Sequence, residues 1–395
     1  MPFFRKVVVA VSGGVDSAVA SLLLKNKGFN VQGVFMRNWD EVEEHGACSV
    51  TQDLKDAEWV CCKIGIPFHY VSFVKEYWIE VFSAFLEDYR SGQTPNPDIL
   101  CNRVIKFASF YKYAVTTLKA DAIATGHYAC TSFGDYLQYH NPEKGCRLLK
   151  ARDSFKDQTF FLSQVPQISL QNTMFPLGNL LKREVKSIAK KYGLDQIAEK
   201  KESTGICFIG LRNFKDFISE YVDPNPGNLV DIDSGKVVGS HSGIHHWTIG
   251  QRCKLSGIPK PYFVAKKDSK SHDIFVAVGT EHPSLYTQYV FVEAPHWIHS
   301  TPDELEEHGI LECWFRFQHT KPLNKCCLVK ISQQELLVHL SVPLRAITPG
   351  QYGVFYRGEE CLGSARITHP GPSLRSLGME LSSFPSNDKN LIEHV

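Results

Sequence analysis

The stretch that decides the fold is KVVVAVSGGVDS, from Lys6 to Ser17. Its first half is a β-branched run of the kind that forms a buried strand. The run ends in Ser-Gly-Gly, and Ser17–Lys27 continues with apolar residues at helical spacing. Gly28 then stands where the end of a helix is expected. The stretch therefore predicts a strand, a glycine loop and a helix, the opening unit of an alternating α/β fold.

The residues that follow repeat this alternation. Strands are predicted at Asn30–Met36, Phe68–Phe73 and Asp121–Thr125, and helices at Thr51–Ile64, Lys75–Arg90, Val104–Leu118 and Lys182–Tyr192. Along Lys75–Arg90 the aromatic residues share one stripe, which favours a core-facing helix over a ligand platform. Strands separated by helices predict a doubly wound parallel sheet with helices on both faces.

The alternation of helices and strands ends near the turn cluster at residues 223–227, DPNPG, which cannot continue a helix. Short Val/Ile-rich runs between turns follow it and predict small all-β modules, a sandwich or a barrel. We expect an α/β domain at 1–210, a small β-rich domain at 211–280, a C-terminal β-barrel at 281–370 and a flexible tail at 371–395. The runs are Asn228–Ile232, Lys236–Gly239, Ile274–Val278, Val290–Val292, Leu311–Phe317, Cys327–Ile331, Leu336–Leu340 and Gly353–Tyr356.

Composition excludes several classes of protein. The 395 residues are 43% hydrophobic, which is ordinary for a folded chain with a core. The formal net charge of +1 gives no global field for nucleic acid or membrane, so a polyanion would have to bind a local patch. The longest apolar runs are too short to span a bilayer. No signal peptide is expected, because charge and a strand-like run lead directly into the glycine loop.

Twelve cysteines are the unusual feature of the composition. None are arranged as C-x-x-C, so their spacing does not indicate zinc, thioredoxin-like redox chemistry or an iron–sulfur cluster. Most are expected to be small buried hydrophobes in a reducing compartment.

Two cysteines stand in distinctive surroundings. Cys101, in TPNPDILCN, follows a proline-rich turn beside the predicted helix from about Val104, whose dipole favours a thiolate. Asp98, three residues earlier, can exchange protons with it. Cys207, in STGICFIG, lies between two glycines in a segment that could expose it. Taken alone, a cysteine in either place is more often a buried packing residue.

The loop SGGVDS places two glycines and two serines at the end of a strand and the start of a helix, where an anion can bind. It lacks the lysine of a Walker A loop and is not G-x-G-x-x-G. The alternative is a tight turn capped by Asp16 or Ser17. The loop resembles the PP-loop of the ATP pyrophosphatases, which implies ATP binding and Mg²⁺ held by Asp16. The implied ATP-binding residues are Ala10, Val11, Ser12, Gly13, Gly14, Val15, Asp16 and Ser17.

A more specific resemblance rests on blocks spread along the chain. They are SGGVDS, GVFMRNWD (33–40), TPNPDILCN (94–102), ATGHY (124–128), SFKDQTFFLS (154–163), STGICFIG (203–210) and TIGQR (248–252), with weaker ones at 348–356 and 360–367. Together they closely resemble the tRNA-specific 2-thiouridylase family, and the mitochondrial members from animals best. This resemblance implies a tRNA sulfurtransferase with ATP and Mg²⁺ as cofactors.

The resemblance also implies a mechanism. ATP adenylates the C2 carbonyl oxygen of the wobble uridine, and a persulfide on Cys207 then delivers sulfur, with loss of AMP and pyrophosphate. Cys101 is the nucleophile that pairs with Cys207, either releasing sulfide or completing a disulfide after the sulfur has attacked C2. Asp98 is the acid/base. The implied partners are tRNA and a persulfide-donor protein, the chain is expected to be monomeric, and the location is mitochondrial or, alternatively, cytoplasmic.

Further site residues follow from the same blocks. Met36 and Gly126 are implied to contact adenosine. The residues implied to meet the target base or the rest of the tRNA are Asn96, Pro97, Asp98, His127, Lys156, Asp157, Gln158, Arg316, Phe317 and Gln351. His127 could instead be a satisfied histidine at a strand end, and Lys156 a solvated charge.

Other interpretations stay open at this point. Leu181–Lys201 holds seven Lys/Arg against three Asp/Glu, which fits either a phosphate-binding face or an ordinary solvated helix. An amide-forming ATP pyrophosphatase would need neither the cysteine pair nor the β-rich modules. A non-catalytic RNA-binding scaffold would not need the intact loop with both cysteine motifs.

Overall fold

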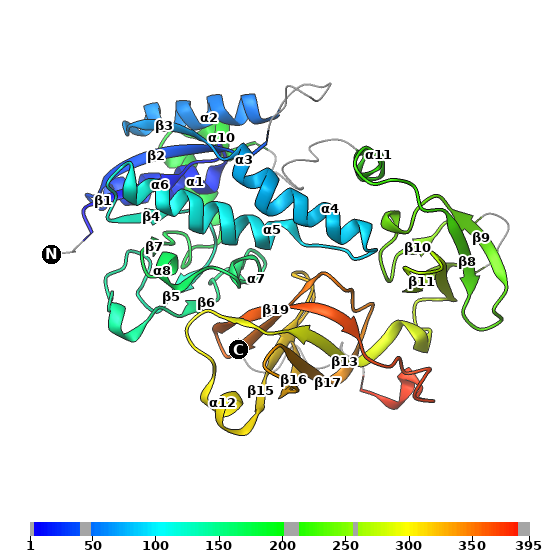
Figure 1. Cartoon of the computed structure of the whole chain (residues 1–395). Helices are drawn as coiled ribbons and strands as arrows, with labels where there is room; N and C mark the ends of the chain where they lie inside the picture. The colour runs from blue at the N-terminus through cyan, green and yellow to red at the C-terminus, as the bar shows by residue number, and fades with distance from the viewer. Residues whose placement is uncertain (1–3, 40–48, 201–212, 256–259, 386–395) are drawn as a thin grey trace.

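The computed structural model describes residues 4–39, 49–200, 213–255 and 260–385 (Figure 1). Its first half is built around a five-stranded sheet in the order β3-β2-β1-β4-β7, with every neighbouring pair parallel. The strands are β1 (Lys6–Ala10), β2 (Asn30–Arg37), β3 (Phe68–Ser72), β4 (Ala122–Ala124) and β7 (Thr173–Met174). The predicted doubly wound sheet is confirmed, with β1 at its centre and Val7, Val8 and Val9 fully buried.

Helices join the parallel strands and pack against the sheet. The first two are α1 (Val15–Asn26) and α2 (Ser49–Ile64), close to the predicted ranges. The shorter helices that follow are α7 (Thr159–Leu162), α8 (Gln167–Leu170), α9 (Lys182–Lys191), α10 (Asp195–Ala198), α11 (Phe214–Ser219) and α12 (Asp303–His308). No helix in the described part of the chain is both long enough and apolar enough to cross a membrane.

Two longer helices contain π-helical stretches. One runs through α3 (Val74–Tyr77), η1 (Trp78–Phe82) and α4 (Ser83–Arg90), and it buries Phe82 and Phe85 as the stripe predicted. The other runs through α5 (Pro97–Leu100), η2 (Cys101–Ser109) and α6 (Phe110–Thr116). It begins seven residues before the predicted Val104, because Asn96 caps it and Pro97 suits the first helical position. Cys101 therefore lies one turn inside this helix, where a π-helical stretch begins.

The second half of the chain is β-rich, as predicted. A five-stranded sheet comprises β10 (Arg252–Cys253), β11 (Tyr262–Lys267), β12 (Ile274–Val278), β8 (Gly227–Asp231) and β9 (Val237–His241). A six-stranded barrel follows, closed by pairing of its first and last strands. Its strands, in order around the barrel, are β13 (Tyr286–Glu293), β17 (Glu335–Arg345), β16 (Asn324–Lys330), β15 (Ile310–Arg316), β18 (Tyr352–Arg357) and β19 (Glu360–Pro370).

The barrel and the first domain share backbone pairing and buried side chains. The short strands β5 (Cys130–Thr131) and β6 (Leu148–Leu149) pair with each other, and β6 continues onto β19. The buried Gln164 amide donates to both the carbonyl and the hydroxyl of Ser364, each at 2.9 Å. A small strand, β14 (His296–Trp297), also pairs with β19. The barrel is therefore built onto the α/β domain.

The start of the expected flexible tail is ordered. Leu374 is fully buried, and its N–H donates to the Tyr286 carbonyl at 3.0 Å. Gly371 donates to the Tyr289 carbonyl at 2.7 Å. Apolar Leu374 and these backbone bonds tie residues 371–375 to β13, and the flexibility expected of the tail stays a prediction.

Candidate functional site

The glycine loop, Ser12–Ser17, lies at the carboxyl end of β1 and opens α1. Gly13 has φ +71°, and a Cβ there would collide with the Asp53 backbone carbonyl, so the position requires glycine. The Ser17 hydroxyl accepts from the Ser12 N–H and donates to the Gly14 carbonyl, each at 3.1 Å. Gly14, at the N-cap, offers no side chain to the N–H groups of the first helical turn. Those groups and the helix dipole suit a phosphate.

Asp16, the predicted Mg²⁺ ligand, is held by two residues. Lys182 Nζ lies 2.8 and 2.7 Å from its two carboxylate oxygens, and the Tyr128 hydroxyl donates to Oδ1 at 2.8 Å. Lys182 is mostly buried and stands in the first turn of α9, where the helix dipole disfavours a cation. A lysine in the first turn of a helix can therefore indicate an acidic partner in another segment, here Asp16.

The loop residues fit a nucleotide better than an isolated metal ion. Glycine backbone, two serine hydroxyls and the Lys182 ammonium together suit the phosphates of ATP. For Mg²⁺ they supply the single carboxylate of Asp16, already paired with Lys182. Mg²⁺ commonly takes one or two protein carboxylates plus substrate phosphates, so the ion fits here only together with the nucleotide. No three His, Cys, Asp or Glu side chains within the described ranges cluster as a metal site.

The residues after β4 connect the loop to the cysteine helix. A Cβ on Gly126 would lie 2.6 Å from the Ser17 backbone nitrogen, so this glycine allows direct packing on the loop. Tyr128 reaches Asp16, and the His127 ring lies 5.8 Å from that of Phe107 in η2. Strand order reverses at β1 and β4, and ligands bind at such a switch point in open α/β sheets. The structure thus brings the loop and the Cys101 helix to one place.

Three ionisable groups near Cys101 influence one another: Asp98, Lys106 and His127. Cys101 is buried, with 6% of its surface exposed. Asp98 is solvent-accessible but crowded by protein, so desolvation raises its pKa while Lys106 opposes the rise. Burial, with a smaller contribution from Lys106, holds the pKa of His127 well below its usual value. A carboxyl with a raised pKa one turn before a thiol suits proton exchange. The sequence did not indicate the role of Lys106, because its effect on His127 depends on a residue from another segment.

The C-terminal barrel holds the turn that precedes this helix. The Gln351 amide donates to the carbonyls of Thr94 and Pro95 at 2.8 and 3.0 Å, and Asn96 donates to its oxygen at 3.4 Å. Gln351 and Asn96, predicted to contact tRNA, therefore also contact each other. Pro97 is buried at the first helical position.

Replacing Gln351 by leucine is expected to lower kcat/KM for tRNA about 10-fold and to reduce the free energy of unfolding by about 1–3 kcal/mol. The substitution leaves two half-buried carbonyls without their donor and loosens the turn. Steady-state kinetics and thermal unfolding measure the two effects, with the exposed Gln333→Leu as the control. Wild-type kinetics for Gln351→Leu would contradict a positioning role.

Two of the other predicted tRNA residues, Asp157 and Arg316, meet between the domains. Asp157 is 4% exposed, and its carboxylate accepts from Arg316 at 3.5 Å and from the Ala151 N–H at 3.0 Å. Phe317 is also buried. The Gln158 oxygen accepts from the Tyr128 N–H at 2.9 Å. The Asp157–Arg316 contact therefore joins the barrel to the α/β domain, and the contact of these residues with tRNA stays a prediction.

Cys207 lies outside the described residues, so its pairing with Cys101 stays a prediction. Just before that segment, Lys200 donates to Asp53 and to buried Asp56, each at 2.6 Å. Asp53 is the residue whose carbonyl lies against Gly13. The chain therefore enters the Cys207 segment beside the nucleotide loop.

Leu181–Lys201 is less of a free basic face than its composition indicated. Lys182 pairs with Asp16, Lys190 with Glu199 and Lys200 with the carboxylates on α2. Met36 lies near the carboxyl end of β2, beside the end of β1, and its contact with adenosine stays a prediction.

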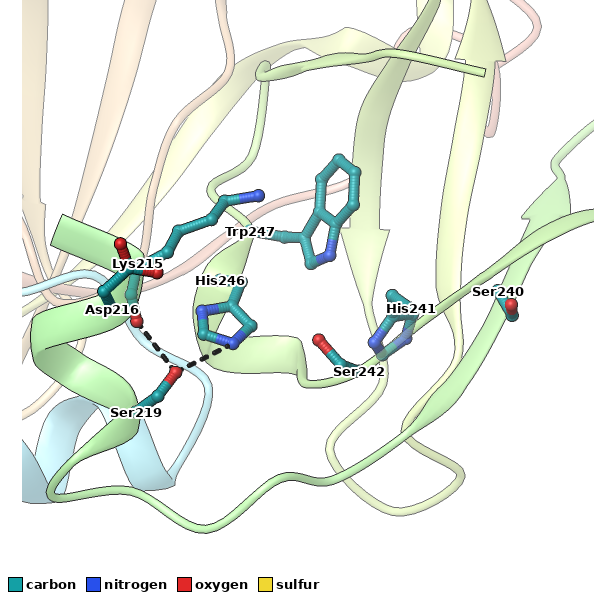
Figure 2. Close-up of a pocket in the computed structure, with 8 residues that line it drawn as sticks. All are labelled: Lys215, Asp216, Ser219, Ser240, His241, Ser242, His246 and Trp247. Atoms are coloured by element: carbon teal, nitrogen blue, oxygen red, sulfur yellow. Dashed lines mark hydrogen bonds between the residues drawn. The ribbon is translucent and has the colours of Figure 1, made fainter. Parts of the chain in front are cut away.

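A polar pocket of about 470 Å³ lies apart from all of these residues, in the central domain (Figure 2). Its walls come from α11, β9 and the segment after β9, and Figure 2 shows His246 facing Ser219, which is hydrogen-bonded to it at 3.4 Å. Its lining residues are Lys215, Asp216, Ser219, Ser240, His241, Ser242, His246 and Trp247.

Acidification is expected to destabilise the protein through the histidines at this pocket and at the site. Burial lowers the pKa of His241, His246 and His127, and lowers that of His245 to about 4. Below pH 6.5 the unfolded chain binds protons that the folded chain does not, so the free energy of unfolding falls. The pKa of His245 alone accounts for a loss of about 1.5 kcal/mol between pH 6.5 and 5, and the other three histidines act in the same direction.

Thermal unfolding from pH 7 to pH 5 measures this loss. His245→Asn should flatten the dependence and the exposed His308→Asn should not. Raised pKa values at Asp88, Asp98 and Asp135 act in the opposite direction: as the pH falls, their effect begins at the raised pKa of the folded state and is complete near the unfolded value of about 4. A melting temperature that stays constant down to pH 5 would contradict the assignment.

Known proteins match the whole described architecture. Profiles described as "tRNA methyl transferase HUP domain", "tRNA methyl transferase PRC-barrel domain" and "Aminomethyltransferase beta-barrel domain" match residues 5–211, 215–278 and 287–367. Mitochondrial tRNA-specific 2-thiouridylase 1 of Drosophila melanogaster is 56% identical, covering 93% of this chain and 95% of the relative. The chain belongs to the tRNA-specific 2-thiouridylase family.

The family extends from animals to bacteria. The Homo sapiens mitochondrial 2-thiouridylase is 49% identical, covering 95% of this chain and 93% of its own length. A tRNA-specific 2-thiouridylase of Streptococcus sanguinis is 45% identical, covering 92% and 95%. The resemblance seen in the sequence blocks is confirmed, and with it the family of tRNA sulfurtransferases. A solved 4-thiouridine synthetase with RNA and ATP aligns at 17% identity and a TM-score of 0.32 over 55% of this chain and 49% of that one, too little to carry an argument.

Proposed function

We propose that this protein is a mitochondrial tRNA 2-thiouridylase that uses ATP to replace the C2 oxygen of the wobble uridine by sulfur. One observation carries the proposal. The segment Gly126–Tyr128 contacts the nucleotide loop on one side and the Cys101 helix on the other. ATP and the sulfur chemistry thereby share one site. The mitochondrial location is supported by the names of the animal relatives.

The first step is activation of the uracil oxygen. A C2 carbonyl is a poor electrophile, so its oxygen attacks the α-phosphorus of ATP and pyrophosphate leaves. The loop N–H groups and Lys182 offset the charge that develops, and Mg²⁺ arriving with the nucleotide would add to this, held on the protein side by Asp16. Asp16 orients Lys182 through the two contacts described above.

The second step transfers sulfur. The terminal sulfur of a Cys207 persulfide, loaded by a donor protein, attacks C2 while the C2–O bond to AMP breaks. The Cys101 thiolate then attacks the Cys207 sulfur, releasing 2-thiouridine and forming a Cys101–Cys207 disulfide. Alternatively, Cys101 attack comes first and releases sulfide, which adds to C2. Asp98 exchanges the protons, and two electrons from an external thiol reduce the disulfide.

The deciding experiment follows thiolation of an unmodified tRNA transcript with ATP and a low-molecular-weight persulfide. An ATP analogue with a non-hydrolysable α–β link should abolish thiolation, and one with a non-hydrolysable β–γ link should support it. Mass spectrometry distinguishes sulfur replacement from the methyl transfer named in two profile descriptions. Pyrophosphate exchange without any thiolated uridine would favour an amide-forming pyrophosphatase and would falsify the proposal.

A further inference from the structure

Phe155 is the most exposed large hydrophobic side chain among the described residues. Its exposed fraction is 91%, and the next, Tyr139, reaches 71%. Single exposed apolar residues are common on protein surfaces, so exposure alone indicates nothing. The surroundings of Phe155 set it apart, because the turn that carries it is fixed and lies at the edge of the site.

The turn is held by Asp153. Its Oδ1 accepts the N–H groups of Phe155 and Lys156 at 3.2 and 3.3 Å, and its Oδ2 accepts the Lys182 N–H at 2.9 Å. A further backbone bond, from the Lys156 N–H to the Asp153 carbonyl, closes the turn at 3.0 Å. The ring is therefore presented to solvent from a closed turn that is anchored to α9 and lies between β6 and α7 along the chain.

Both ends of this turn lead to the proposed site. On one side, the backbone N–H of Lys182 donates to Asp153, and the ammonium of the same residue donates to Asp16. On the other, the Gln158 N–H donates to the Tyr128 carbonyl at 2.8 Å, and the Phe161 carbonyl in α7 accepts from Asn102, next to Cys101, at 2.9 Å. Phe155 thus projects from the segment that joins the nucleotide loop to the cysteine helix.

The ring has cations and acidic groups around it. Exposed Arg152 and half-buried Lys156 flank it along the chain, and exposed Arg183 follows Lys182 on α9. The Asp153 carboxylate is taken up by the N–H groups of the turn, and Arg152 pairs with Glu184 at 3.2 Å. An exposed aromatic ring with cations nearby can bind an unpaired RNA base, with the ring stacking on the base and the cations near phosphates. A protein partner would require a wider apolar area around the ring, whereas its chain neighbours Ser154 and Lys156 are polar.

We propose that Phe155 stacks on an unpaired base of the tRNA anticodon loop and holds the loop while the wobble uridine enters the site. The inference rests on the proposed function for the identity of the RNA. It adds a positioning residue beside the predicted Lys156, Asp157 and Gln158, and it assigns a stacking role distinct from phosphate contact.

The test is equilibrium binding of an unmodified tRNA transcript without ATP, repeated over a series of salt concentrations. Phe155→Ala should weaken binding about 10-fold, and the slope of log Kd against log salt should not change, because no phosphate contact is lost. Lys156→Gln should instead reduce that slope by about 0.7–0.9, the share of one phosphate. Phe155→Tyr and Phe155→Trp should bind like the wild type, and Phe155→Leu should resemble Phe155→Ala. Thermal unfolding should stay unchanged in all Phe155 variants.

Two outcomes would overturn the proposal. One is wild-type affinity in Phe155→Ala or Phe155→Leu, which would show that no base stacks on the ring. The other is normal tRNA affinity with slower thiolation only when sulfur comes from a protein-bound persulfide, which would assign the ring to the donor protein. Binding is measured without turnover, so a wild-type protein that binds tRNA and never thiolates it fails the proposed function but not this comparison.

Discussion

Replacing Lys182 by methionine is expected to slow ATP-dependent thiolation by about 100- to 1,000-fold, the usual cost of losing one charged or hydrogen-bonding group that faces the developing charge. The ammonium lies 2.7–2.8 Å from both oxygens of Asp16, in the loop that fits the phosphates. Without it the Asp16 carboxylate faces the nucleotide uncompensated, so like charges repel. The loss should appear in pyrophosphate exchange as well as in thiolation, because it acts on adenylation.

Two comparisons separate this effect from a general loss of folding. Lys112→Met, on the exposed surface of α6, removes an equal charge and should leave the rates unchanged. The double variant Asp16→Asn/Lys182→Met should be no slower than the worse single variant, because the two residues act as a pair. A Lys182→Met protein with normal pyrophosphate exchange would limit Lys182 to a structural role.

Replacing Cys101 by serine is expected to reduce thiolation at least 1,000-fold while pyrophosphate exchange continues. A serine hydroxyl cannot displace sulfur from a persulfide at neutral pH, since the nucleophile in this exchange is a thiolate. Cys101 lies one turn after Asp98, whose raised pKa suits it to exchange the thiol proton. Cys207→Ser should show the same separation of adenylation from sulfur transfer.

Mass spectrometry of the stalled protein tests the order of events. In Cys101→Ser, tRNA linked through C2 and a disulfide to Cys207 should accumulate if the persulfide attacks C2 first, whereas the persulfide itself should accumulate if Cys101 attack comes first. The Cys101–Cys207 disulfide should be absent in both cases. Cys62→Ser, which changes an exposed cysteine on α2, is the matched control and should behave like the wild type. Normal thiolation in both Cys101→Ser and Cys207→Ser would exclude the cysteine mechanism.

Local pattern predicted the parts of the fold that are locally determined. The first strand, the glycine loop and α1 follow from a β-branched run, two glycines and helical spacing. The strands β5, β6 and β7, of two residues each, were missed because so short a segment has no measurable period. The start of the cysteine helix can be recognised in the sequence, since asparagine followed by proline is a strong helix-opening pair, although the same residues are also typical of a turn.

Long-range partners explain what the sequence could not indicate about the site. Lys182 meets Asp16 across 166 positions, and Arg316 meets Asp157 across 159. No local spacing encodes such pairs. Family blocks placed Asp157, Arg316 and Gln351 at the tRNA, whereas packing shows that their side chains also join the barrel to the catalytic domain.

The pairing of β6 with β19 has a consequence for synthesis on the ribosome. Leu148 emerges some two hundred residues before its strand partner, Cys361, so the nucleotide-binding half leaves the ribosome with an unpaired strand edge. The Gln164 amide likewise lacks its hydrogen-bond partner until Ser364 has been synthesised. A chain that stops before residue 360 would lose more than a C-terminal strand, because the catalytic half would lack the partners that complete it. Premature stop codons late in the gene should therefore be as damaging as early ones.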